Sequence, residues 1–253
     1  QGKSMERDYW YSSTRNFANL EDAESIGVEA ARRAVSRLNA KTISSRVCPI
    51  IFPAEIASSF FNTFLSAING HSIYKKSSFL VEKLGCELFP KFLTIREDPS
   101  VANAIGTRPF DSDGVITSKK TIIDNGILKT YLLDTYSARK LNQECTGNGV
   151  ITNIIVESAE EQPSNLLSHV DEGIIITEMM GSGANLLTGD YSRGASGFYF
   201  KNGEVKYPVN GITVASNLSE MFKNIINIGD DYDTRGNIHT GSVLIDKMTI
   251  GGC

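Results

Sequence analysis

The residue types most able to do chemistry gather in the run "GDYSRG", residues 189 to 194. An acid, a phenol, a hydroxyl and a guanidinium stand there between glycines, which permit a tight backbone. These groups could contact a substrate, or serve an unrecognised hydrolytic site in a homodimer. We expect instead that Asp190 and Arg193 pair and hold the loop together. The residues of this candidate site are Gly189, Asp190, Tyr191, Ser192, Arg193 and Gly194.

Histidines and cysteines are too scattered to predict a metal centre. None of the three histidines lies at i, i+4 spacing from another or near a cysteine at ligand spacing. The four cysteines form no C-x-x-C, so reduced thiols are expected. The histidines are His71, His169 and His239, and the cysteines are Cys48, Cys86, Cys145 and Cys253.

Three other motifs that could indicate a binding or catalytic site are incomplete. Gly181 and Gly183 form G-x-G, but Leu186 stands where a dinucleotide loop needs its third glycine. Residues 137 to 140 fit S-x-x-K without the companion motifs of penicillin-binding proteins, so the serine is expected to cap a helix. Residues 231 to 236 resemble a calcium loop that lacks its remaining ligands, which favours a solvated acidic turn.

The elements that must position these residues begin with a strand predicted at 6 to 14. A helix over 19 to 39 follows, with Asn19 as its N-cap. A buried strand at 47 to 52 precedes a second helix over 54 to 69, which Gly70 is expected to end. The first helix should bury Ile26, Ala30, Ala34, Val35 and Leu38, and should turn Arg32, Arg33 and Arg37 to solvent.

Strands dominate the second half of the sequence. Asn125-Gly126 and Asn202-Gly203 each predict a two-residue hairpin turn, because both residues tolerate positive φ. Helix-like pieces are expected at 77 to 85, at 164 to 169 and, capped by Asn217, at 217 to 229. A buried strand at 173 to 180 and a final strand at 241 to 252 complete an α+β fold.

Composition favours a globular protein of the cytoplasm over a nucleic-acid or membrane protein. The net charge is −4 and the pI is about 5.5, so no basic surface for nucleic acid is predicted. No apolar run approaches the roughly 18 residues of a membrane span. The start, "QGKSMERDYW", lacks an initiator methionine, and we expect that a preceding domain is missing.

The order of several blocks resembles the carboxyl-terminal region of the TldD/PmbA family, whose older name is modulator of DNA gyrase. The resemblance covers essentially all of residues 1 to 253, and the family has an amino-terminal α/β domain ahead of this region. The blocks are "RDYWYSSTR", "GVEAARRAVSRL", "IYKKSSFLVEKLG", "PFDSDGV", "ILKTYLLDTYSARKL", "TGNG", "GDYSRGASGFYFKNGEVKYPV" and "GSVLIDKMTIGG".

The resemblance implies that this chain is of the zinc-free TldE type. TldD-type members are zinc peptidases with H-E-x-x-x-H on a helix and a late cysteine. In this sequence Phe61, Asn62 and Ser66 occupy the positions of the first His, the Glu and the second His of that motif. Thr240 stands at or near the position of the cysteine. None of these side chains can replace an imidazole or a thiolate as a zinc ligand.

The same resemblance implies a partner and a role. It predicts a cytoplasmic heterodimer with a TldD-type zinc peptidase, which alone holds the zinc and which degrades unfolded peptides, leader peptides and antitoxins. The hairpins at Asn125-Gly126 and Asn202-Gly203, together with the loop at 189 to 194, would form walls of a substrate chamber shared by the two subunits. Strand edges of this chain would pair with the extended peptide. The alternatives are a homodimeric hydrolase and a regulatory protein that binds DNA gyrase.

Overall fold

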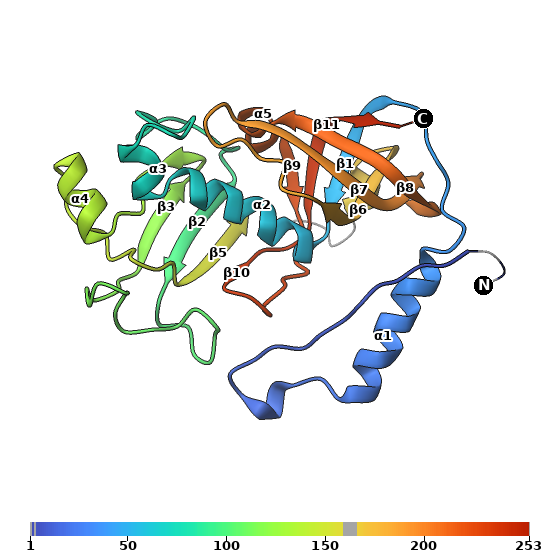
Figure 1. Ribbon diagram of the computed structural model, residues 1–253, viewed down its shortest axis with the longest axis horizontal. Coiled ribbons are helices and arrows are strands. Elements are labelled where there is room, and N and C mark those ends of the chain that lie inside the picture. Colours follow the sequence, from blue (N-terminus) through green and yellow to red (C-terminus); the bar gives the residue numbers. More distant parts are fainter. Residues whose placement is uncertain (1, 3, 159–165, 253) are drawn as a thin grey trace.

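The longest strands form a sheet that closes on itself in the computed structural model, which describes residues 2, 4–158 and 166–252 (Figure 1). The hydrogen-bonded order is β1-β6-β7-β8-β11-β9, and β1 also pairs with β11. That extra pairing closes β1, β6, β7, β8 and β11 into a barrel. The strands are β1 (Arg46–Phe52), β6 (Glu172–Met180), β7 (Asp190–Lys201), β8 (Glu204–Asn217), β9 (Ile225–Ile228) and β11 (Val243–Gly251).

A second, five-stranded sheet is open and has the order β10-β5-β2-β3-β4. Its outer strands, β10 and β4, each have two residues. Both predicted hairpins are confirmed: Asn125 and Gly126 join β3 to β4, and Asn202 and Gly203 join β7 to β8, all with positive φ. The strands are β2 (Leu93–Asp98), β3 (Lys120–Asp124), β4 (Ile127–Leu128), β5 (Asn153–Ser158) and β10 (Ile238–His239).

Helix α2 (Ala54–Ala67) runs across both sheets and joins their cores (Figure 1). Its Phe60 and Phe64 rings lie 5.2 and 5.6 Å from the ring of Phe222. Phe64 also meets Phe89 edge-on at 5.0 Å. One cluster of buried residues includes members of both sheets, so the two sheets share a single core through α2.

The remaining helices are short, except for the first. They are α1 (Ala23–Ser36), α3 (Gly70–Tyr74), α4 (Thr135–Leu141) and α5 (Leu218–Lys223), with 3-10 turns at η1 (Phe17–Asn19) and η2 (Leu166–His169). The predicted α+β class is confirmed. In the part of the chain that the structure describes, no helix is long and apolar enough to cross a membrane.

Residues 4 to 16 form an extended segment, here called the arm, and the strand predicted at 6 to 14 is wrong. The arm pairs with no strand and is held through side chains instead. Asp8 contacts Arg33 of α1, and Trp10 lies under the same guanidinium, 5.1 Å from ring centroid to Cζ. Arg15 donates to the carbonyls of Ile105 and Thr107, both at 2.8 Å. Alternating residue types therefore predicted the extended backbone correctly but not a partner strand.

The orientation predicted for α1 is only partly correct: Ile26, Ala30, Ala34 and Leu38 are partly buried as expected, but Val35 is exposed, and Arg33 and Arg37 are partly buried. Its N-cap is Asp22, whose side chain accepts from the Ser25 N–H, whereas Asn19 ends η1. No residue of α1 is buried, and Val28 and Val35 are 63% and 62% exposed. The helix lies beside the body of the molecule with the arm (Figure 1), and Arg33 and Arg37 point inward. The inner side of the helix thus contains Arg33 and Arg37 beside the apolar stripe, because partners for both arginines lie there.

Four further local predictions need correction. Residues 77 to 85 form turns, not a helix. Of the helix predicted at 217–229, only 218–223 is helical, since 225–228 is β9.

Two residues at helix ends also have other roles than predicted. Gly70 begins α3, where a Cβ would stand 2.1 Å from Ser137 Oγ. Asp134, not Ser137, caps α4, and Ser137 closes a capping box with it. The piece predicted near 164–169 is η2 from 166 onward, and its first two residues lie outside the described residues.

Candidate functional site

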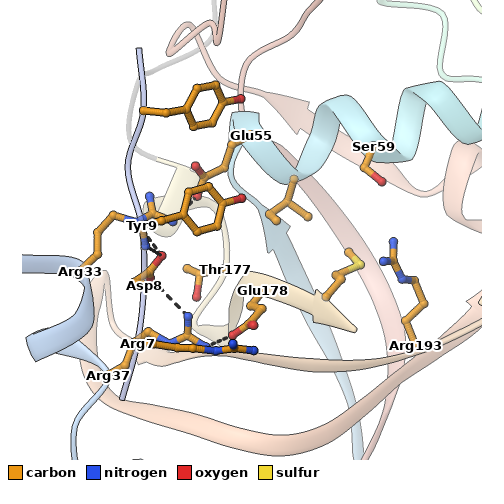
Figure 2. Close-up of a pocket in the computed structure, with 13 residues that line it drawn as sticks. Arg7, Asp8, Tyr9, Arg33, Arg37, Glu55, Ser59, Thr177, Glu178 and Arg193 are labelled. Atoms are coloured by element: carbon orange, nitrogen blue, oxygen red, sulfur yellow. Dashed lines mark hydrogen bonds and ion pairs between the residues drawn. The ribbon is translucent and has the colours of Figure 1, made fainter. Parts of the chain in front are cut away.

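A cavity of about 590 Å³ lies where the arm, α1, α2, β6 and β7 meet. The arm provides Tyr9 and Tyr11, whose rings stack 6.2 Å apart. Helix α2 contributes Glu55 and Ser59 to the opposite wall (Figure 2). The volume falls in the range of roughly 300–1,000 Å³ that small-molecule pockets have.

A β-bulge shapes the floor of this cavity. The β6–β7 register shifts between Ile176 and Glu178, so Thr177 has no partner residue on β7. Side chains of a regular strand alternate between faces, but a bulge redirects them. Thr177, Glu178 and Met179 consequently all line the cavity, although they are consecutive. The strand predicted to be covered on both faces is therefore buried in its first half and borders an open space in its second.

The arginines expected to face solvent form an ion-pair network at one end of the cavity. Arg33 binds Glu55 at 2.7 Å and lies 3.3 Å from Asp8, and Arg37 contacts both Asp8 and Glu178 (Figure 2). Only Arg32 is solvated as predicted, paired with Glu29 on its own helix. Sequence reasoning missed Arg33 and Arg37 because their partners lie on the arm, α2 and β6.

The ion pair predicted between Asp190 and Arg193 is wrong. The run 190–194 is the start of β7 rather than a loop, so residues 190 and 193 project from opposite faces of the strand. The carboxylate of Asp190 is exposed and accepts from the Thr188 hydroxyl at 2.7 Å. Arg193 instead reaches into the cavity from the side opposite the ion-pair network (Figure 2).

The other members of the predicted site are divided between the same two faces. Tyr191 is buried, its hydroxyl lies 2.8 Å from Met179 Sδ, and burial raises the pKa of this phenol. Ser192 is exposed and its backbone N–H donates to the Gly183 carbonyl. Gly189 has a φ of +81° beside the side chain of Asn217, and Gly194 is opposite Met180 on β6. Of the predicted set, Arg193 lines the cavity.

Gly183 is the residue that allows Arg193 its position. A Cβ on Gly183 would lie 1.8 Å from the Ser192 carbonyl oxygen and 2.6 Å from Arg193 Cγ. The G-S-G run therefore has a structural role in this fold, since no helix follows it to bind a nucleotide.

We expect Gly183→Ala to lower the free energy of unfolding by about 1–3 kcal/mol, because backbone must move to admit the methyl group. Denaturant unfolding followed by circular dichroism measures the change. The matched control is Gly27→Ala in α1, where a Cβ meets nothing within 4 Å. That control should stabilise the helix by roughly 0.5–1 kcal/mol. Equal stability of wild type and Gly183→Ala would contradict the packing described.

A second group of residues fastens the arm next to the cavity. The Arg235 guanidinium lies 4.0 Å from the Trp10 ring and 4.6 Å from the Tyr11 ring. It also binds Asp233 at 2.8 Å and Glu55 at 3.3 Å. Burial alone would raise the pKa of Asp233, but the hydrogen bonds from Arg235 outweigh it and hold that pKa below its ordinary value. The turn expected at 231–236 is exposed at four of its six residues, but Asp233 and Arg235 are partly buried and form a clamp on the arm. Asp231 accepts hydrogen bonds from the Ser242 hydroxyl and N–H.

Comparison with known proteins identifies the fold. Residues 45–252 match the profile described as "PmbA/TldA metallopeptidase C-terminal domain". The chain belongs to the PmbA/TldD metallopeptidase family. It is 44% identical over 249 residues to "Metalloprotease PmbA" of Escherichia coli O157:H7, a match that covers 98% of this chain and 55% of that protein. A PmbA homolog of Buchnera aphidicola from Baizongia pistaciae is also 44% identical, over 98% of this chain and 56% of its own length.

Solved structures of PmbA/TldD-type proteins show the same architecture. A putative modulator of DNA gyrase from Bacteroides thetaiotaomicron has a TM-score of 0.91 at 29% identity, over 97% of this chain and 56% of that one. TldE from Thermococcus kodakarensis has a TM-score of 0.81 at 23% identity, over 92% of this chain and 56% of that one. At this identity the likeness supports a common fold only. The family resemblance is therefore confirmed, and this chain spans about 55% of the curated relatives.

The positions matched to the zinc motif of PmbA/TldD peptidases do not fit a zinc ion. Phe61 is fully buried among other phenyl rings, and Asn62 is exposed on α2. Ser66 donates to the Asn62 carbonyl, and Thr240 is buried after β10 with its hydroxyl bound to Gly241 O. Among the described residues, no group of three or more His, Cys, Asp or Glu is placed to hold a metal ion.

Proposed function

We propose that this chain is the carboxyl-terminal part of a zinc-free, TldE-type subunit. It would act in the cytoplasm with a TldD-type zinc peptidase, in a heterodimer that degrades unfolded or flexible peptides such as leader peptides and antitoxins. Family membership supports the peptidase context. The observation on which the zinc-free role depends is the chemistry at Phe61, Asn62, Ser66 and Thr240, which offers zinc neither an imidazole nor a thiolate.

The fold limits how such a subunit could hold a peptide by strand pairing. Closure of the barrel leaves its paired strands few free edges, whereas the open sheet ends in the short strands β10 and β4. Strand β10 borders a groove of about 360 Å³ that also includes Ser59 and Asn62 of α2. The hairpin turn at Asn125-Gly126 packs against the Phe89 carbonyl. The turn at Asn202-Gly203 has free space around it, since a Cβ on Gly203 would meet nothing within 4 Å. We therefore favour the β10 edge and the open hairpin as wall elements.

The outward face of α1 supports the presence of a protein partner. Val28 and Val35 are exposed there, and Phe17 of η1 is 88% exposed. Val28 and Val35 are seven residues apart and therefore lie on one face of the same helix, and exposed apolar surface that gathers in this way is typical of interaction sites. We propose that the TldD-type subunit covers this face of α1.

Co-purification tests the partnership. A tagged full-length subunit should retain a TldD-type subunit at one-to-one stoichiometry, with zinc present only in the partner. Val28→Glu should weaken the complex at least about 10-fold, because burial of an unpaired carboxylate costs more than about 1.4 kcal/mol. Light scattering after size exclusion measures both.

The control for this experiment is Ile116→Glu, at an apolar residue that is 81% exposed, against 63% for Val28, and lies in a loop outside α1. It should leave the complex intact. A homodimer that excludes the TldD-type subunit, or zinc bound by this chain itself, would contradict the proposal.

A further inference from the structure

The cavity contains an unusual concentration of buried polar atoms without partners. In the described part of the chain, four buried side-chain nitrogen or oxygen atoms accept or donate no hydrogen bond. Three of them, Arg33 Nε, Thr177 Oγ1 and Arg193 Nε, belong to residues that line this one cavity. Such groups are rare in native proteins, because each costs roughly 1–3 kcal/mol unless something binds to it.

The three atoms differ in what they could bind. Arg33 Nε lies 3.3 Å from Asp8 Oδ1, so its charge is balanced although the geometry gives no hydrogen bond. Thr177 Oγ1 is neutral and sits in the bulge of β6. Arg193 has no ion pair among the described residues, and no dashed line reaches it in Figure 2. Among the described arginines that line the cavity, Arg7 and Arg193 thus have no carboxylate partner, and Arg193, which lies beside the Tyr191 hydroxyl, is the partly buried one of the two.

The carboxylates that line the cavity do not neutralise Arg193, because each is already paired with another arginine. These carboxylates, Asp8, Glu55 and Glu178, are all bound to Arg33 or Arg37 at the far end (Figure 2). Glu55 also pairs with Arg235 outside the cavity. The stem of Arg193 is fixed against Gly183, which leaves its planar head projecting inward.

We propose that this cavity binds a carboxylate of an extended peptide, with Arg193 as the anion-binding residue. An arginine binds a carboxylate through two parallel N–H donors, and no carboxylate of the described residues occupies those of Arg193. The chain of the ligand would run toward Thr177, whose hydroxyl donates to a peptide carbonyl, with Tyr9 and Tyr11 at the mouth. That the carboxylate belongs to a peptide rests on the proposed function, whereas its negative charge follows from the cavity alone.

Calorimetric titration of this subunit, without a TldD-type partner, tests the site. The probes are N-acetyl-Gly-Gly with a free carboxylate, its C-terminal amide, N-acetyl-Asp-Gly-amide and inorganic phosphate. We expect a free-carboxylate probe to bind at least about 10-fold more tightly than the amide, as hydrogen bonds to charged groups predict. The two acidic peptides distinguish a chain terminus from an acidic side chain.

Arg193→Gln should abolish this preference for the acid, and Arg193→Lys should retain part of it. Arg96→Gln is the matched control, because Arg96 pairs with Glu157 on the other sheet. If Arg193→Gln is unstable, Thr177→Val serves instead, with an expected loss of a few-fold for the acidic peptide. Equal binding of acid and amide, tighter binding of phosphate, or an unchanged Arg193→Gln would overturn the inference. The titration measures binding without cleavage, so its result can be interpreted even if the proposed proteolytic role is wrong.

Discussion

Arg235→Ala is expected to release the arm from the body of the protein. The guanidinium lies between two aromatic rings of the arm and two carboxylates of the body, Asp233 and Glu55. Its side chain is 14% exposed, so removal leaves the largely desolvated Asp233 without its cation, whereas Glu55 keeps its ion pair with Arg33. We expect the free energy of unfolding to fall by about 3 kcal/mol, at the lower end for a broken buried pair.

The chain contains a direct reporter of this release. Trp10 is the only tryptophan, and its ring lies under Arg235 and Arg33. Emission of Arg235→Ala should shift to longer wavelength as the indole enters water, and proteolysis within residues 4 to 16 should accelerate. Arg32→Ala is the control, because Arg32 is 67% exposed and pairs only within α1, so its effect should stay within about 0.5 kcal/mol. An unchanged emission maximum in Arg235→Ala would refute the clamp.

Phe61→Ala should destabilise the protein by about 3–5 kcal/mol, the usual cost of removing a buried phenyl ring. Phe61 is fully buried, with ring centroids 5.4 Å from Phe60 and 6.4 Å from Phe89. These contacts join α2 to the segment before β2, so the cavity left by the substitution would loosen the shared core. Thermal and denaturant unfolding measure the loss.

Asn62→Ala is the neighbouring control on the same helix. Asn62 is exposed, and the effect of its removal should remain within about 0.5 kcal/mol. Similar stability losses at positions 61 and 62 would show that α2 does not bury the face described. Both residues also stand where the family resemblance places the His and Glu of the TldD-type zinc motif, so the two variants test the structural role proposed for these positions.

Local sequence signals predicted the elements whose causes are local. The Asn-Gly turns, the strand at 47–52 and the helix at 54–69 follow from turn chemistry, residue type and spacing, and all are present. The helix predicted at 217–229 failed after Lys223, because pairing of β9 with β11 overrides a helical pattern of apolar residues.

The cavity could not be predicted, because its charged residues find partners far along the chain. Arg37 meets Glu178 from a distance of 141 residues, and Arg235 meets Glu55 from 180 residues away. A single sequence shows only that α1 has an arginine-rich side, which is ordinarily solvated. Arg193 belongs to the candidate site that the sequence suggests and lines the cavity, but the ion pair expected with Asp190 requires a loop, whereas "GDYSRG" begins a strand. In a strand, residues 190 and 193 cannot face each other.

The most direct test of the proposed zinc-free role is a peptide-cleavage assay with three preparations: this subunit, the proposed TldD-type partner, and the two mixed at equal concentration. The substrate is an unfolded leader-type peptide, and each preparation is assayed with and without added Zn²⁺. We predict that this subunit alone cleaves nothing under either condition and that the mixture cleaves faster than the partner alone. Cleavage by this subunit alone, or equal rates for the partner and the mixture, would contradict the account.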